Sequence, residues 1–255
     1  MKSVLRCDLS GKIALVTGSG RGIGAAIARQ LASDGARVVV NDLRGRDANS
    51  VAAEIRAENG GAIAHSADVS SPSAVRELFR SISRWGQHLD ILVCNAAITN
   101  SKDIFDVSLR DWEKVLRVNV TGLFLCAKFG MQMMRRQKTG GRIILVGSGV
   151  VHQGALTGYV AYAASKGAVH SMAKTLARTG APFGITVNTV APGMTDTELL
   201  RNAHTKAEIQ SIASTIPLGI GRPEDVATAV AYLASDAARH LTGVTLDVNG
   251  GQIIR

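Results

Sequence analysis

A short apolar segment followed at once by a glycine-rich turn is the feature that most constrains how this chain folds. Residues 12–17 are apolar and rich in β-formers, residues 18–24 include four glycines, and an apolar helical stretch follows. Glycines let the backbone approach a ligand closely, and a helix N-terminus presents free N–H groups and a positive dipole end to a pyrophosphate. Gly18, Gly22 and Gly24 give the spacing G-x-x-x-G-x-G in place of G-x-G-x-x-G. The unit nevertheless predicts a dinucleotide site, the alternative being a turn that serves tight packing alone.

Strand-like and helical patterns alternate along the chain. The strand-like segments fall near residues 12–17, 36–41, 62–67, 89–94, 142–147, 185–190 and 243–247. Their continuous apolar runs are typical of parallel strands buried on both faces, and amphipathic stretches such as 73–85 and 223–235 stand between most of them. The alternation predicts an α/β fold with a Rossmann-type doubly wound parallel sheet of about seven strands flanked by helices. Such a sheet binds its ligands at the carboxyl ends of the strands.

The chain carries no sign of a division into domains. No Pro-rich, Ser-rich or charged linker interrupts its 255 residues, so we expect a single dinucleotide-binding and catalytic domain over residues 1–255. Residues 195–215 are polar and charged, without a clean strand or long helix pattern. We interpret this stretch as a substrate lid, the alternative being a surface loop with no gating role.

The charge and hydropathy of the chain exclude several classes of partner. The net charge of +9 would suit nucleic acid, but the basic residues are dispersed and only 4% of residues are aromatic, so we expect no nucleic-acid partner. No apolar stretch is as long as a membrane span, so no membrane partner is expected. Residues 1–8 contain no apolar core of signal-peptide length, and a cytoplasmic location is therefore expected.

The cysteines and histidines form no metal-binding motif. Cys7, Cys94 and Cys126 are scattered and suit reduced thiols, and the last two lie in apolar runs where burial is expected. The six histidines pair with no closely spaced cysteine or carboxylate, so no catalytic metal is predicted. His152, four residues after Ser148, is a candidate for the substrate pocket, the alternative being a loop histidine without function.

A hydroxyl, a phenol and an amine stand close together in the sequence between residues 148 and 166. Tyr162 and Lys166 are four residues apart, so on a helix their side chains share one face. An ammonium beside a phenol favours the phenolate, and the pair therefore predicts a tyrosine whose pKa is lowered for acid-base catalysis. Taken alone, such a pair is more often a solvated tyrosine beside a surface lysine.

Six ordered motifs, taken together, resemble the classical short-chain dehydrogenase/reductase family. They are Thr17-Gly18-(x)3-Gly22-x-Gly24, Asn95-Ala96-Ala97, Asn119, Ser148, Tyr162-(x)3-Lys166 and Pro192-Gly193. The resemblance runs through nearly the whole chain and ends in a C-terminal strand and turn at residues 246–251. Ala97 departs from the pattern, because the family usually has glycine there.

The resemblance implies a set of roles for individual residues. The catalytic residues implied are Asn119, Ser148, Tyr162 and Lys166, with Ser148 bonding the substrate oxygen and Asn119 keeping a water in a proton relay to Lys166. The cofactor-binding residues implied are Gly18, Arg21, Gly22, Ile23, Gly24, Asp42, Asp68, Val69, Asn95, Ala96, Tyr162, Lys166, Pro192, Gly193, Thr195 and Thr197. The substrate-binding residues implied are Ser148, His152, Tyr159 and Tyr162.

The choice between the two nicotinamide dinucleotides depends on Asp42. This carboxylate follows the second strand, 18 residues after Gly24, where it would accept from a free ribose 2'-hydroxyl and repel a 2'-phosphate. Arg21 and Arg44 act in the opposite sense. We therefore expect NAD as the cofactor, with NADP less favoured.

Two substrate classes remain open. The favoured hypothesis is an NAD(H)-dependent oxidoreductase that interconverts a small secondary alcohol and a ketone. The alternative is a 3-oxoacyl-(acyl-carrier-protein) reductase using NADPH, to which the overall resemblance and the basic surface also point. Residues 181–183 lack the basic residue that carrier-dependent relatives tend to place there. The resemblance further implies a homotetramer that pairs helices near 112–137 and 160–180 and the C-terminal strand.

Overall fold

Seven parallel strands form one central sheet in the computed structural model, which describes residues 7–155, 158–203 and 205–254. Residues 1–6, which belong to the N-terminal segment without a signal-peptide core, lie outside the described residues. So does His204, which belongs to the expected lid. The strands are β1 (Ile13–Thr17), β2 (Arg37–Asp42), β3 (Ala62–Ser66), β4 (Ile91–Cys94), β5 (Gly141–Val146), β6 (Ile185–Pro192) and β7 (Thr245–Val248). Their order in the sheet is β3-β2-β1-β4-β5-β6-β7, so the predicted doubly wound α/β fold is confirmed.

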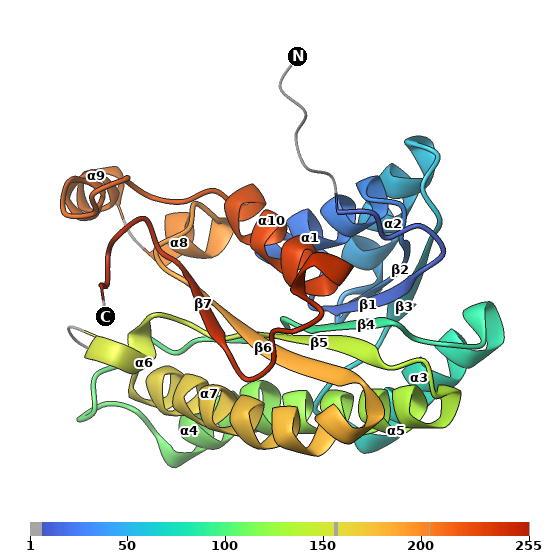
Figure 1. Ribbon diagram of the computed structural model, residues 1–255. Coiled ribbons are helices and arrows are strands. Elements are labelled where there is room, and N and C mark those ends of the chain that lie inside the picture. The colour runs from blue at the N-terminus through green and yellow to red at the C-terminus, as the bar shows by residue number, and fades with distance from the viewer. Residues whose placement is uncertain (1–6, 156–157, 204, 255) are drawn as a thin grey trace.

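Helices cover both faces of this sheet. The longer ones are α1 (Gly22–Ser33), α2 (Gly45–Ala57), α3 (Pro72–Gly86), α4 (Leu109–Leu116), α5 (Leu123–Gln137), α7 (Val160–Gly180), α9 (Lys206–Ser214) and α10 (Pro223–Ala234). The short ones are η1 (Arg117–Gly122), α6 (Val150–Gln153), η2 (Ala181–Phe183), α8 (Glu198–Ala203) and η3 (Asp236–Ala238). Figure 1 shows α1, α2 and α10 on one face of the sheet and α3, α4, α5 and α7 on the other.

The strand sequences explain this layering. Side chains alternate along a strand, so Ala14 and Val16 of β1 join the core under α1 and α10, whereas Ile13 and Leu15 join the core under α3 and α5. All five residues of β1 are buried, as expected for a strand covered on both faces. The sheet therefore holds the carboxyl ends of its strands rigidly along one edge.

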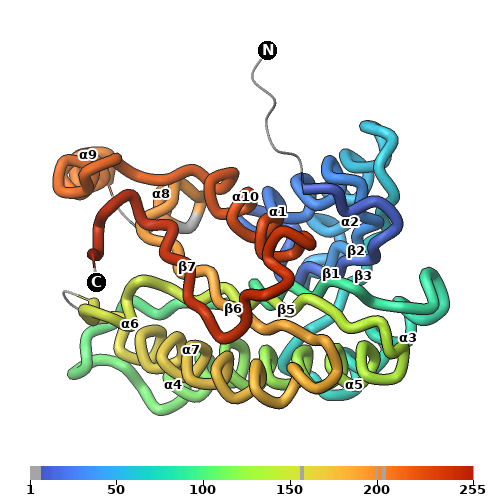
Figure 2. The backbone as a smooth tube through the Cα atoms, in the orientation of Figure 1, coloured from blue at the N-terminus to red at the C-terminus, as the bar shows by residue number. Residues whose placement is uncertain are grey.

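Strands β1 to β3 are added toward one side of the sheet, and strands β4 to β7 are added toward the other side. This change of side between β1 and β4 places a topological switch point beside the glycine turn. In Figure 2, α6, α8 and α9 lie together at one end of the molecule, close to the C-terminal segment. These elements follow β5 and β6 in the chain, so the carboxyl edge is where the loops gather. An open α/β sheet binds its ligands at this edge.

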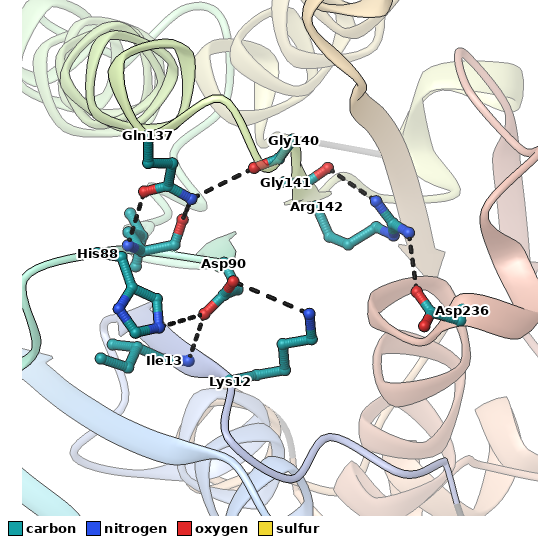
Figure 3. A network of polar contacts seen from close by, with 10 residues as sticks. Lys12, Ile13, His88, Asp90, Gln137, Gly140, Gly141, Arg142 and Asp236 are labelled. Carbon is teal, nitrogen blue, oxygen red and sulfur yellow. Dashed lines mark hydrogen bonds and ion pairs between the residues drawn. The ribbon is translucent and has the colours of Figure 1, made fainter.

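A polar network ties the strand starts together at the opposite edge (Figure 3). The Asp90 carboxylate accepts from the backbone nitrogen of Ile13 at 2.8 Å and lies 3.1 Å from His88 Nε2. Gln137, at the end of α5, accepts from the backbone nitrogen of Leu89 at 3.1 Å and donates to its carbonyl at 2.8 Å. These bonds stabilise the edge away from the expected ligand site.

Three details differ from the sequence-based expectation. The helix expected over 112–137 consists of α4, the π-helical segment η1 and α5. The stretch 195–215, which shows no clean pattern in the sequence, contains the two short helices α8 and α9. Asp42 and Pro192, expected just after their strands, are the last residues of β2 and β6, because their backbones continue the parallel pairing.

Candidate functional site

The glycine turn packs so tightly that its glycines are required by the fold itself. Gly18 has a φ of 61°, and a Cβ added there would lie 2.7 Å from the Cα of Ala96. A Cβ added at Gly24 would overlap the carbonyl oxygen of Gly18. Gly22 has a φ of 55° and faces the Thr197 methyl group without a clash, at 3.7 Å from an added Cβ. The turn thus brings α1 against the strand ends and leaves Gly22 facing the segment after β6.

The N-terminus of α1 suits an anionic ligand. Arg21 at the N-cap makes no capping hydrogen bond with its side chain, and no acidic residue lies in the first turn. Backbone N–H groups at such a terminus, together with the helix dipole, attract phosphate. Ile23 is partly buried against the core, and its backbone forms part of the turn. This donor set fits the pyrophosphate of a nicotinamide dinucleotide.

Asn95, one of the implied cofactor-binding residues, contacts the glycine turn. Its Nδ2 donates to the carbonyls of Thr17 at 3.0 Å and Gly18 at 2.9 Å. The hydroxyl of Thr17 in turn accepts from the backbone nitrogens of Asn95 and Ala96 at 3.1 and 3.2 Å. Asn95 and Ala96 therefore fix the shape of the turn across the switch point.

Asp42 also contacts the glycine turn. Its Oδ2 accepts from the backbone nitrogen of Gly20 at 3.0 Å, and its Oδ1 accepts from the backbone nitrogen of Arg44 at 3.0 Å. The carboxylate is half-buried, so it remains accessible at the end of β2. Its position beside the turn agrees with contact to an adenosine ribose.

The two arginines near Asp42 each have an acidic partner. Arg21 Nη1 lies 3.1 Å from Glu198 Oε2 on α8, and Arg44 Nη1 lies 3.8 Å from Asp47 Oδ2. Both pairs are largely exposed, so each contributes little to stability. Each arginine nevertheless has an acidic partner within ion-pair distance, close to the Asp42 carboxylate at the end of β2.

Asp68 and Val69, which follow β3, lie in different environments. Asp68 is exposed, and its Oδ1 accepts from both the backbone nitrogen and the hydroxyl of Ser70 at 2.8 Å. Val69 is buried, and its side chain packs under Gly122, where an added Cβ would lie 2.9 Å from it. Only the backbone of Val69 is therefore available to a ligand.

Ser148, Tyr162 and Lys166 come together at the end of β5. A hydrogen bond links the side chains of Ser148 and Tyr162. Lys166 Nζ lies 5.6 Å from the centre of the Tyr162 ring and donates to the carbonyl oxygen of Val146 at 2.7 Å. Ser148 Oγ accepts from the backbone nitrogen of Val150 at 3.2 Å. The expected hydroxyl, phenol and amine thus form one cluster.

The pKa values in this cluster differ from the sequence-based expectation. Burial raises the pKa of Tyr162, and the hydrogen bond from Ser148 offsets this only in part. Burial also lowers the pKa of Lys166 to about 8. The prediction of a lowered tyrosine pKa is therefore wrong for this structure, because the desolvation of the phenol dominates and the ammonium is bound to the Val146 carbonyl.

Asn119 lies within the π-helical segment η1 and is buried. Its Nδ2 donates to the carbonyl of Ile98 at 2.9 Å and to the hydroxyl of Ser165 at 3.0 Å, and its Oδ1 accepts from the backbone nitrogen of Ile98 at 2.8 Å. Ser165 in turn donates to the carbonyl of Tyr162 at 2.7 Å. The Asn119 side chain therefore joins the loop after β4 to the helix that carries Tyr162, and π-helical segments are frequent at functional sites.

The two further substrate-site candidates, Tyr159 and His152, lie near different members of the site. Tyr159 has a φ of 56°, a left-handed conformation that is strained for an aromatic residue and is found at binding sites. His152 is exposed on α6, and its ring packs edge-on against the ring of His170 at 5.7 Å between centroids. His170 and Ser165 were missed in the sequence. His170 repeats the spacing of four that relates Tyr162 to Lys166, which is the signal that could have found it.

The segment after β6 connects the site to the glycine turn. The backbone nitrogen of Gly193 donates to the carbonyl of Val248 at 2.9 Å. Thr195 is buried and its hydroxyl donates to the Gly193 carbonyl at 3.1 Å. Thr197 caps α8 by accepting from the backbone nitrogen of Leu200 at 3.3 Å. The Pro192 carbonyl accepts from the backbone after Ser148, so the two loops are joined.

Other sites are absent from the part of the chain that the structure describes. Among these residues no group of three or more His, Cys, Asp or Glu side chains could hold a metal ion. No helix within the described ranges is long and apolar enough to cross a membrane. Cys94 and Cys126 are buried as expected, and burial raises the pKa of the Cys126 thiol to about 12.

Comparison with known proteins agrees with this geometry. A family model described as enoyl-(acyl carrier protein) reductase matches residues 18–252. The 3-oxoacyl-(acyl-carrier-protein) reductase FabG of Aquifex aeolicus is 41% identical, over 97% of this chain and 99% of that protein. An NADPH-dependent aldehyde reductase-like chloroplastic protein of Arabidopsis thaliana is 40% identical, over 96% of this chain and 95% of that protein. A crystal structure of a short-chain type dehydrogenase/reductase from Mycobacterium marinum matches with a TM-score of 0.93 at 35% identity, covering 97% of this chain and 98% of that chain.

Proposed function

Because the chain belongs to the classical short-chain dehydrogenase/reductase family, whose members are oxidoreductases that use NAD(P), we propose that it reduces the 3-oxo group of an acyl thioester. The single observation that carries the reaction type is the cluster of Ser148, Tyr162 and Lys166 at the same edge of the sheet as the glycine turn. The substrate class is suggested by the relative from Aquifex aeolicus, whose name gives a 3-oxoacyl thioester on a carrier protein.

The protonation of Tyr162 favours the reductive direction. A phenol whose pKa is raised keeps its proton at neutral pH and can act as a general acid. The reduced nicotinamide, when bound, supplies the hydride to the carbonyl carbon. Tyr162 then gives its proton to the carbonyl oxygen, which becomes the product hydroxyl. Ser148 holds that oxygen through its own hydroxyl, and Lys166 offers positive charge beside the phenol as the proton leaves.

We assign the cofactor to the glycine turn and the surfaces around it. The backbone of residues 18–24 and the N-terminus of α1 would hold the pyrophosphate, and Asp42 the adenosine ribose. Thr197 faces Gly22 and would contact the nicotinamide end. Asp42 carries a negative charge at the end of β2, which would repel a ribose 2'-phosphate, whereas Arg21 and Arg44 are each paired with an acidic side chain. NAD(H) is therefore the proposed cofactor.

A basic side chain supports the acyl-carrier hypothesis despite the sequence of residues 181–183. Phe183 stands in that segment, and the guanidinium of Arg135 from α5 lies 4.8 Å from its ring centre. The cation that the local sequence lacks is thus supplied by a neighbouring helix. An acidic carrier protein would be attracted to such a site, and this removes one argument against the thioester.

We also propose a substrate lid and a homotetramer. We propose that α8 and α9 close over the substrate, with the ion pair between Glu198 and Arg21 acting as a contact to the glycine turn. A homotetramer is proposed from the resemblance of α4, α5, α7 and β7 to interface elements. Within α5, Leu123 and Ala127 are buried in the chain's own core, whereas Phe124 is 48% exposed and is the better candidate for such an interface.

The test is a substrate panel with each reduced cofactor. Acetoacetyl-N-acetylcysteamine, an acyl-carrier-bound acetoacetyl group and several small ketones are offered with NADH or NADPH, and absorbance at the nicotinamide band is followed. The proposal predicts the largest kcat/KM with a thioester and NADH. Activity confined to small ketones and the corresponding secondary alcohols would instead support the second candidate function, an NAD(H)-dependent oxidoreductase of small secondary alcohols. Asp42 agrees with that function as well, because it favours NAD(H).

A further inference from the structure

The histidine one turn beyond Lys166 contacts the backbone that carries Ser148. The backbone nitrogen of Ser148 donates to His170 Nε2 at 3.4 Å. The imidazole also lies against Gly147, where an added Cβ would overlap Nε2. Tyr162, Lys166 and His170 are spaced by four on α7, so all three reach the carboxyl end of β5.

The three consecutive N–H groups after β5 have unequal partners. Gly147 and Gly149 donate to backbone carbonyls of β6, at 2.8 and 3.1 Å. Ser148 lies between them, and its N–H is held by the side chain of His170. The residue that carries the catalytic hydroxyl is therefore the one whose backbone depends on a side chain from α7.

We propose that His170 is a positioning residue that fixes the direction of the Ser148 hydroxyl. A histidine nitrogen accepts only when it is unprotonated, so the imidazole is neutral and carries its proton on Nδ1. Ser148 Oγ also accepts from the backbone nitrogen of Val150 at 3.2 Å, so the serine is held from two sides. His152 packs edge-on against the His170 ring. This inference rests on the proposed role of Ser148.

A double-mutant cycle tests whether His170 acts through Ser148. His170→Leu replaces the acceptor of the Ser148 N–H with an apolar side chain. In His170→Gln the side-chain oxygen can still accept this hydrogen bond. The loss of one hydrogen bond predicts a kcat about 3- to 10-fold lower for His170→Leu, with the cofactor KM unchanged and most activity kept in His170→Gln. In a Ser148→Ala background, His170→Leu should cause no further loss.

Two outcomes of the cycle would overturn the proposal. One is an equal fall in kcat from His170→Leu with and without the Ser148 hydroxyl. The other is a fall in His170→Gln as large as in His170→Leu. His240→Leu makes the same substitution at an exposed histidine after η3 and should leave kcat unchanged.

A second measurement needs no turnover and therefore separates this inference from the proposed function. NMR of protein labelled with ¹⁵N in histidine reports which ring nitrogen carries the proton. At pH 7.5 the His170 signals should show an unprotonated Nε2 and a protonated Nδ1. A protonated Nε2 would overturn the inference, even if the enzyme reduces thioesters as proposed.

Discussion

Replacing the buried lysine of the site should stabilise the protein at neutral pH while abolishing catalysis. Lys166 is 4% exposed, and burial lowers its pKa from the usual 10.5 to about 8. That fall corresponds to a cost of about 3 kcal/mol for holding the ammonium in the folded state at pH 7. Lys166→Met removes this cost but also removes the donor to the Val146 carbonyl, worth about 1 kcal/mol. The variant should therefore be more stable by about 2 kcal/mol at pH 7.

The pH dependence separates the charge from other effects of the substitution. The pKa is lower in the folded state, so between pH 8 and 10.5 the folded wild type binds fewer protons than the unfolded chain. Its stability relative to Lys166→Met consequently rises with pH across this window, and the cost is fully present below pH 8. By pH 10 about 2.5 kcal/mol of the difference should have disappeared, which makes the wild type equal to or more stable than the variant.

The assay is urea unfolding of both proteins at pH 7 and pH 10, followed by tryptophan fluorescence. Lys174→Met is the matched control, because it removes an exposed lysine from the same helix and no buried charge. A stability difference between wild type and Lys166→Met that stays constant from pH 7 to pH 10 would refute the reasoning. So would a variant that is destabilised at both values.

Three further substitutions test other parts of the structure. Gly24→Ala should lower stability by about 1–3 kcal/mol in urea unfolding and weaken NADH binding measured by fluorescence titration, because its methyl group overlaps the Gly18 carbonyl. Glu198→Gln should release Arg21 from its ion pair and shift the ratio of kcat/KM for NADPH over NADH upward by about 2- to 5-fold, and an unchanged ratio would exclude that arginine from cofactor choice. Gln137→Ala should cost about 1–3 kcal/mol of stability, since it leaves backbone groups at the strand starts without a partner, but kcat should not change.

The sheet and the position of the site could be predicted because both depend on local patterns. The apolar runs and the glycine turn predict strand and helix directly, and the carboxyl ends of parallel strands meet at one edge. For that reason Ser148 could be placed near the glycine turn although 130 residues separate it from Gly18. Tyr162 and Lys166 share a helix face for an equally local reason.

The remaining features depend on tertiary contacts that no short pattern encodes. The ion pair between Arg21 and Glu198 joins residues 177 positions apart. The π-helical segment around Asn119 reflects bonds to the β4 loop and to α7, which propensity does not register. The sequence predicts the wrong direction for the shift in the Tyr162 pKa, because residue spacing shows the neighbouring cation but not the burial that outweighs it.

The central claim is that Tyr162 donates the proton in carbonyl reduction, and one variant tests it most directly. Turnover of acetoacetyl-N-acetylcysteamine by Tyr162→Phe is compared with wild type, and NADH affinity is measured by fluorescence titration on the same samples. Loss of a general acid predicts a kcat lower by about 10²- to 10⁴-fold, with the NADH Kd unchanged within about 2-fold. Turnover within about 10-fold of wild type, with the Kd likewise unchanged, would contradict the account.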